Sequence, residues 1–159
     1  MVKTLSAALV LIVASLFASV SLANDEAGIG LIKKQSAYSF DDTVAKLEAA
    51  LAERNIGVMN TIDHAAGAQT VDQSLRPTTL LIFGNPAIGS QLMAASQSIG
   101  IDLPLKALVY EDENGVICVE YNDIAYLARR HGIAADHPVI ARIAGGLEMV
   151  TDAATRPAE

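Results

Sequence analysis

The sequence predicts an α+β fold: a single small domain, residues 24–159, in which helices pack on an antiparallel-containing β-sheet of about five strands. Two observations predict this class. Short segments with strand-like patterns alternate with segments of helical spacing, in the order β-α-β-α-β-α-β-β-α-α. Near the middle, Asn114-Gly115 joins two strand-like segments by a tight hairpin, which requires antiparallel pairing. No internal repeat or low-complexity linker divides the chain, so we expect one domain.

Residues 1–23 are predicted to be a removable export signal. Lys3 precedes an apolar run from Leu5 to Val20, and small residues, Ser21 and Ala23, stand three and one positions before the expected cleavage. The alternative is a membrane anchor, but a spanning helix needs about 20 apolar residues and this run has about 16. We therefore expect a periplasmic mature protein that has no membrane attachment after cleavage.

Charge and cysteine content exclude several partner classes. The formal net charge is −7, and basic residues are not clustered beyond pairs such as Arg129-Arg130. Nucleic acids and anionic membranes are bound through clustered basic residues, so neither is an expected partner. Cys118 is the single cysteine and lies in an alternating strand pattern. This favours a buried, inert thiol over a reactive or intermolecular one.

The first half of the domain is predicted to begin with a strand at Gly30–Lys34. A helix follows, with Ser39 as its N-cap ahead of two acidic residues, and it ends at Gly57. A second strand is expected from Gly57 to His64, and the small residues of Ala65–Ala68 favour a short helix.

The next strand and helix are predicted from a run of apolar residues followed by capping residues. Thr78–Phe83 is continuously apolar after Arg76-Pro77, which is typical of a central strand buried on both faces. Asn85 can then cap a helix whose first position is Pro86.

The last third is predicted to hold the hairpin and two helices. Its strands are Lys106–Glu111 and Val116–Tyr121. Asn122 is expected to cap the short helix Asp123–His131, and Asp136 to begin the final helix. That helix is interrupted by Gly145-Gly146, each of which weakens it by about 1 kcal/mol. The tail from Ala153 is expected to fray.

Several motifs carry a family resemblance. They are the segment 76–86 (Arg-Pro-Thr-Thr-Leu-Leu-Ile-Phe-Gly-Asn-Pro), the segment 102–106 (Asp-Leu-Pro-Leu-Lys), the hairpin, and Tyr121-Asn122. With them, nearly the whole mature chain resembles the domain-of-unknown-function family 302 (DUF 302). The resemblance implies a compact sheet with helices on one side and a homodimer, and it implies no established activity. Many members carry a cysteine before Asn-Pro and another directly after Leu-Pro. Gly84 and Leu105 occupy these positions here, so this chain resembles an exported subgroup without the family's thiol pair.

Seven residues at predicted strand ends are candidates for ligand binding, and a single cleft is expected to gather them: His64, Arg76, Asn85, Pro86, Lys106, Tyr121 and Asn122. Backbone N–H groups near Asn85 could receive an anion, although Asn85 can equally serve only as a helix cap. Lys106 could add positive charge to the same cleft or be a solvated lysine.

Three functional hypotheses follow. The first is a non-enzymatic exported domain that binds a small ligand or protein partner, as a homodimer. The second is an enzyme, such as a hydrolase, with His64 as general base and Lys106 or Asn85 holding an oxyanion. The third is a copper-handling envelope protein using Met59, Met93 and His64. No zinc-type cluster and no Gly-x-Ser-x-Gly motif occurs, so no cofactor, metal site or catalytic residue is assigned.

Overall fold

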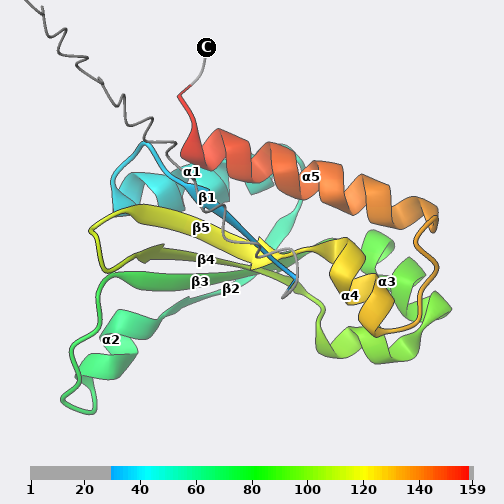
Figure 1. Ribbon diagram of the computed structural model, residues 1–159, viewed down its shortest axis with the longest axis horizontal. Coiled ribbons are helices and arrows are strands. Elements are labelled where there is room, and N and C mark those ends of the chain that lie inside the picture. The colour runs from blue at the N-terminus through cyan, green and yellow to red at the C-terminus, as the bar shows by residue number, and fades with distance from the viewer. Residues whose placement is uncertain (1–29, 158–159) are drawn as a thin grey trace, which may run out of the picture.

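The computed structural model describes residues 30–157, so the predicted export signal lies outside the described residues. Five strands form one antiparallel sheet in the spatial order β1-β5-β4-β3-β2 (Figure 1). The strands are β1 (Leu31–Gln35), β2 (Gly57–Asp63), β3 (Thr78–Gly84), β4 (Leu105–Glu111) and β5 (Ile117–Asn122). The predicted α+β class, the single domain and the order of the elements are confirmed.

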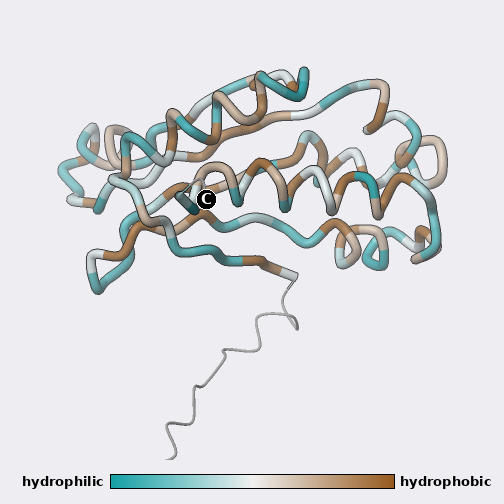
Figure 2. Tube along the Cα trace, turned by 90° about the horizontal axis from the view of Figure 1, so that it is seen from above, coloured by the Kyte–Doolittle hydropathy of each residue, from teal (hydrophilic) through white to brown (hydrophobic). Residues whose placement is uncertain are grey.

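The helices are divided between one face of the sheet and its two ends. They are α1 (Phe40–Glu53), α2 (His64–Gln69), α3 (Pro86–Ala95), α4 (Ile124–Arg130), α5 (Pro138–Thr155) and a 3-10 helix, η2 (Gln97–Ile101). In Figure 1, α1 and α5 lie side by side over the sheet, α3 and α4 gather at one end, and α2 lies at the other. Hydrophobic and hydrophilic positions alternate along α5 in Figure 2, as expected for a helix that covers a core.

Within residues 30–157, helices cover only one face of the sheet. Along β3, Thr79, Leu81 and Phe83 are buried, whereas the side chains between them are half-buried on the other face. The prediction that this strand is buried on both faces is therefore wrong. Its unbroken apolar run arises because Leu80 and Ile82 remain apolar on the open face, where neighbouring strands shield them in part.

Helix starts agree with the sequence prediction at two places and differ at two others. Ser39 caps α1 by accepting a hydrogen bond from Asp42 N, and Asn85 caps α3. However, α4 is capped by Asp123, because Asn122 is still paired with Leu31 in the sheet. The N-cap of α5 differs by one residue as well.

At the N-terminus of α5 the cap is His137 rather than Asp136. Its Nδ1 accepts a hydrogen bond from Val139 N at 3.4 Å. The other end of α5 does not fray at Ala153 as predicted, since Thr155 is buried and its carbonyl accepts a hydrogen bond from Ala37 N. Packing against the segment that follows β1 stabilises the last turn.

Cys118 is fully buried, as its strand pattern predicts. It lies in β5, opposite Tyr110 in β4. Burial raises the pKa of the Cys118 thiol, which disfavours the reactive thiolate.

Asp112 should make stability depend on pH. Its Oδ1 accepts hydrogen bonds from Val116 N and Asn114 N, both at 2.9 Å, and these bonds lower its pKa below the usual 3.8. The unfolded chain therefore takes up this proton first, so the stabilisation is present above pH 3.8 and is lost as the pH falls through the folded-state pKa. We expect Asp112→Asn to flatten the acid limb of the unfolding free energy, measured by urea denaturation between about pH 2 and pH 6. Equal slopes in wild type and variant would contradict this role.

Candidate functional site

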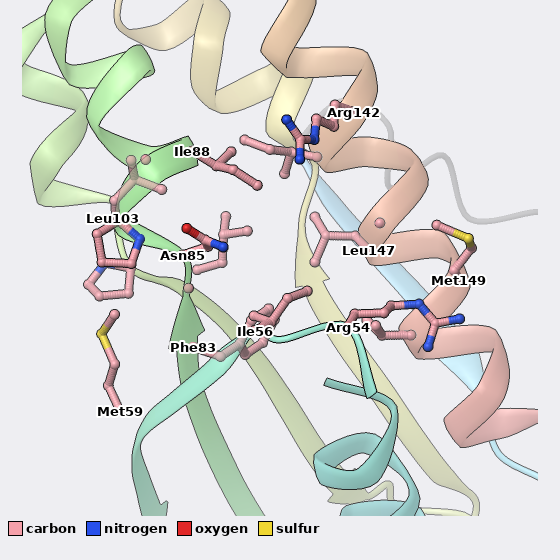
Figure 3. Close-up of a pocket in the computed structure, with 18 of the residues that line it drawn as sticks. Arg54, Ile56, Met59, Phe83, Asn85, Ile88, Leu103, Arg142, Leu147 and Met149 are labelled. Carbon is pink, nitrogen blue, oxygen red and sulfur yellow. The ribbon is translucent and has the colours of Figure 1, made fainter. Parts of the chain in front are cut away.

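A cavity of about 470 Å³ opens at the end of the sheet where β3 passes into α3 (Figure 3). Phe83 and Gly84 line it from β3, and Leu105 lines it from β4. Its other sides are formed by the start of α3, the Leu103-Pro104 segment, the middle of α5, and the chain between α1 and β2. The volume lies within the range of about 300–1,000 Å³ that is usual for small-molecule sites.

The position of the cavity follows from how the chain turns at this end. β3 stops at Gly84, and Asn85 and Pro86 start α3 at once. On the return path, the Lys106 ammonium group donates hydrogen bonds to Asp102 O at 2.9 Å and Pro104 O at 3.0 Å. These bonds hold the Leu103-Pro104 segment at the cavity wall.

Helix α5 leaves space for the cavity by means of a glycine. Gly146 lines the cavity, whereas its neighbour Gly145 lines a separate groove of about 290 Å³. A Cβ atom added at either glycine would meet no atom within 4 Å. Glycine in a helix interior costs about 1 kcal/mol relative to alanine. The helix therefore gives up stability at two positions where the adjoining space is unfilled.

The lining is apolar apart from a few polar groups. Arg54 and Arg142 line the cavity from different sides in Figure 3, and both residues are exposed. Arg54 donates a hydrogen bond to Ala50 O and lies 3.7 Å from the exposed Glu53. Among the residues that the structure describes, Arg142 has no ion pair, and no Asp or Glu lines the cavity.

Asn85 adds a hydrogen-bond donor to this lining. Its Oδ1 accepts the capping hydrogen bond from Ala87 N at 2.9 Å. The capping role proposed from the sequence is thus observed, and the amide nitrogen of the same side chain remains available on the cavity side. Together with the two arginines, it makes every polar side chain of the lining a potential donor.

The methionines gather here as well. Met59, Met93 and Met149, which are all the methionines of residues 30–157, line the cavity and are exposed. Met59 and Met149 lie on different sides of the cavity in Figure 3. Flexible thioether side chains allow such a surface to adapt to ligands of different shape.

Gly84 and Leu105, the positions at which the family resemblance implies cysteines in many members, also line the cavity. A methyl group at Gly84 would lie 3.6 Å from the Met59 terminal carbon. The cavity of this chain is therefore apolar where a thiol pair would stand. Both positions to which the resemblance assigns the thiol pair therefore lie in the lining of the cavity.

The structure does not bring the seven predicted site residues into one cleft. Asn85 and Pro86 line the cavity. Lys106 is next to Leu105 but alternates to the opposite, open face of the sheet, and its ammonium group is engaged with backbone carbonyls. Lys106 therefore adds its charge to the turn rather than to the cavity.

The other four residues lie elsewhere. His64 begins α2, and Arg76 donates a hydrogen bond from Nε to Glu111 O at 3.0 Å, so both are at the opposite end of the sheet. Tyr121 is buried and lines the second groove, while Asn122 pairs with Leu31. Strand direction explains the positions of His64 and Arg76, because β2 runs away from the cavity end and β3 begins at the far end. Tyr121 and Asn122 end β5 at the same end of the sheet as the cavity, but β4 separates β5 from β3, and Tyr121 lines the second groove instead.

The proposed copper ligands are likewise divided. Met59 and Met93 line the cavity and His64 does not. Within residues 30–157, no group of three or more His, Cys, Asp or Glu side chains is arranged to hold a metal ion.

The sequence did not predict Arg54 and Arg142 as site residues, because no local pattern connects a helix end with the middle of a distant helix. The Gly145-Gly146 pair and the distribution of methionines were the available signals.

Comparisons with known proteins agree with this fold. Residues 32–152 match the family model described as "Domain of unknown function DUF302". The fold is similar to the crystal structure of an uncharacterized conserved DUF302 protein from Bacillus stearothermophilus, with a TM-score of 0.72 and 20% identity, covering 79% of this chain and 98% of that one.

Two curated relatives are named Fluoride-specific ion channel FluC 1. They are from Brucella suis biovar 1 (strain 1330) and Brucella abortus biovar 1 (strain 9-941), and each is 38% identical over 118 residues. The match covers 73% of this chain but only 46% and 44% of those proteins, so it spans less than half of their length. Within residues 30–157, no helix has the length and apolar character to cross a membrane.

Proposed function

We propose that this chain, which belongs to the DUF302 family, binds a small amphipathic anion, for example a medium-chain fatty acid, in the cavity between α3 and α5. The observation that carries the proposal is a largely apolar cavity whose polar side chains are two arginines and one asparagine. Such a lining suits a ligand with an apolar body and one anionic head group.

The charge argument concerns the head group. The chain has a formal net charge of −7, yet the cavity lining includes Arg54 and Arg142 and no described acidic residue. Glu53, outside the lining, lies 3.7 Å from Arg54, so Arg142 is the arginine of the lining without an ion pair among the described residues. An arginine donates charge-assisted, often bidentate hydrogen bonds to a carboxylate. Asn85 can add a neutral donor from its amide nitrogen. A cationic ligand would be repelled by the same arginines.

The apolar argument concerns the body of the ligand. Ile56, Ile88 and Leu147 point into the cavity in Figure 3, and the three methionines extend the apolar surface to the mouth. Each buried methylene group of a ligand contributes about 0.8 kcal/mol by leaving water. A chain of several methylenes therefore supplies affinity, and the arginines supply selectivity for the anion.

The proposal places this binding outside the cytoplasm, after removal of the export signal, and in a homodimer. The open face of the sheet, with the half-buried Leu80, Ile82 and Leu108, offers a surface for that dimer. The channel activity named for the Brucella relatives belongs to proteins more than twice as long as the matched segment, and the proposal concerns that segment alone.

Isothermal titration calorimetry with dodecanoate and dodecanol tests the head-group selectivity. We expect dodecanoate to bind more tightly than dodecanol. Arg142→Gln should weaken the binding of dodecanoate by about 10- to 100-fold, because a charge-assisted hydrogen bond contributes about 1.5–3 kcal/mol, and should leave the binding of dodecanol nearly unchanged. Arg129→Gln, an exposed arginine on α4 outside the cavity, is the matched control.

Two outcomes would contradict the proposal. If neither compound binds, the cavity is not a site for this ligand class. If both bind equally and Arg142→Gln changes neither affinity, the selection for an anion is wrong.

A further inference from the structure

Three polar side chains outside the cavity form a continuous hydrogen-bonded chain. Ser98 Oγ lies 2.8 Å from His131 Nδ1, and His131 Nε2 lies 2.7 Å from Asp102 Oδ2. Ser98 is in η2, Asp102 follows η2 directly, and His131 is the C-cap of α4. The fold thus joins residues that are 33 and 29 positions apart, and none of the three lines the cavity.

The direction of the hydrogen bonds follows from the chemistry of the groups. A carboxylate oxygen only accepts, so the hydrogen on the His131 ring is on Nε2 and points at Asp102. In the neutral ring Nδ1 is then unprotonated and accepts a hydrogen bond from the Ser98 hydroxyl group. In this arrangement the ring nitrogen can remove a proton from Ser98, and the carboxylate sets the tautomer that makes this possible.

The serine is the exposed member of this hydrogen-bonded chain. Ser98 is exposed, whereas the side chains of His131 and Asp102 are only 8% and 16% exposed. Asp102 is held from two further sides, because Arg130 Nη1 lies 3.4 Å from Oδ1 and Lys106 donates to its carbonyl oxygen. The solvent-accessible hydroxyl group of Ser98 is therefore hydrogen-bonded to an imidazole ring that is largely buried and held in place by Asp102. A purely structural link between η2 and α4 does not require the hydroxyl end to be open to solvent.

We propose that Ser98 and His131 are the catalytic residues of an acyl-transfer site that hydrolyses small esters, with Asp102 as positioning residue. Ser98 Oγ attacks the ester carbonyl carbon while its proton passes to His131 Nδ1. The bond to the leaving alcohol breaks, the alcohol oxygen takes that proton, and Ser98 is left as an acyl ester. Water then attacks the acyl carbon, giving one proton to His131, and the carboxylic acid leaves as that proton returns to Ser98.

A second hydroxyl group lies beside the nucleophile. Ser96 Oγ is 3.2 Å from Ser98 Oγ, so it can donate a hydrogen bond close to the carbonyl oxygen on which negative charge develops. This site is independent of the proposed anion binding, since it shares no lining residue with the cavity. Loss of ligand affinity and loss of esterase activity are therefore separate outcomes.

Covalent labelling of the full mature protein with a fluorophosphonate, located by peptide mass spectrometry, tests the site. We expect Ser98 to be the labelled residue. His131→Gln should lower the labelling rate by about 100-fold, the usual contribution of a general base. Ser98→Ala should abolish the label, and Ser90→Ala, an exposed serine on α3, should not change it. Hydrolysis of p-nitrophenyl acetate should follow the same order.

The role of Asp102 is separated from a structural one by rescue. Asp102→Asn should lower the labelling rate, and Asp102→Glu should restore part of it, while circular dichroism and the urea midpoint are followed for each variant. Labelling of native Ser98 no faster than in the urea-unfolded chain would overturn the proposal, as would an unchanged rate in a folded His131→Gln variant.

Discussion

Replacing Gly146 by leucine is expected to lower the affinity for dodecanoate by more than tenfold while leaving the protein at least as stable as wild type. The side chain would enter the cavity, where a Cβ atom at this position meets no atom within 4 Å. It would therefore occupy ligand space without displacing core residues. The same change removes a helix-interior glycine, which should raise the unfolding free energy by about 0.5–1 kcal/mol. Calorimetric titration and urea denaturation measure the two effects on one sample.

Gly145→Leu is the matched control for this prediction. It makes the same change one residue earlier in the same helix, but Gly145 lines the separate groove beside Tyr121. We expect a similar gain in helix stability and an affinity for dodecanoate close to that of wild type. If Gly146→Leu binds dodecanoate normally, the cavity does not hold the ligand. If both variants lose affinity equally, the effect arises from α5 as a whole.

Gly30→Ala should cost about 2–5 kcal/mol of unfolding free energy, the largest effect that we expect from removing a single glycine. Gly30 has φ +74°, a conformation that costs an alanine about 1–2 kcal/mol. In addition, its Cβ atom would lie 2.2 Å from Tyr126 Cγ, so the ring or the backbone must move. Overpacking of this kind lowers the unfolding free energy by about another 1–3 kcal/mol. Asp123 N donates to Gly30 O, so movement of this residue also disturbs the start of α4.

Gly115→Ala separates the two contributions. Gly115 has nearly the same φ, +76°, but lies in the exposed hairpin turn with no atom within 4 Å of an added Cβ. We expect this variant to lose only the conformational part, about 1–2 kcal/mol. Urea denaturation gives both values. Equal losses at Gly30 and Gly115 would show that the Tyr126 ring moves away at no cost.

The accuracy of the sequence prediction varied with the distance between the interacting residues. The hairpin at Asn114-Gly115 and the caps Ser39 and Asn85 depend on neighbours within about four residues, and these were correct. The cap of α4 was misplaced by one residue because Asn122 is kept in the sheet by Leu31, which is far away in the sequence. A pairing of this kind leaves no local pattern.

The candidate site shows the same limit more strongly. Asn85 and Pro86 were found because a strand-to-helix junction is visible locally. Arg142 was not predicted as a site residue, because its place at the cavity depends on how α5 lies across the sheet. The chain from Ser98 to His131 and Asp102 was also missed. The sequence predicts His131 only as the last residue of the short helix, whereas the fold places its ring next to Ser98 and Asp102.

The amino-acid sequence by itself determined the α+β class, the order of the helices and strands and most helix boundaries, because periodicity, caps and turns act over a few residues. Its motifs also carried the resemblance to the family whose model matches residues 32–152. The tertiary structure decided which strand ends share an edge, which face of the sheet remains open, and which distant side chains meet. Which strand ends, sheet faces and side chains meet depends on strand pairing and on the path of α5. The residues involved are separated by up to about a hundred positions in the sequence. Function is therefore proposed from the cavity and from the serine-histidine-aspartate chain, both of which only the fold assembles.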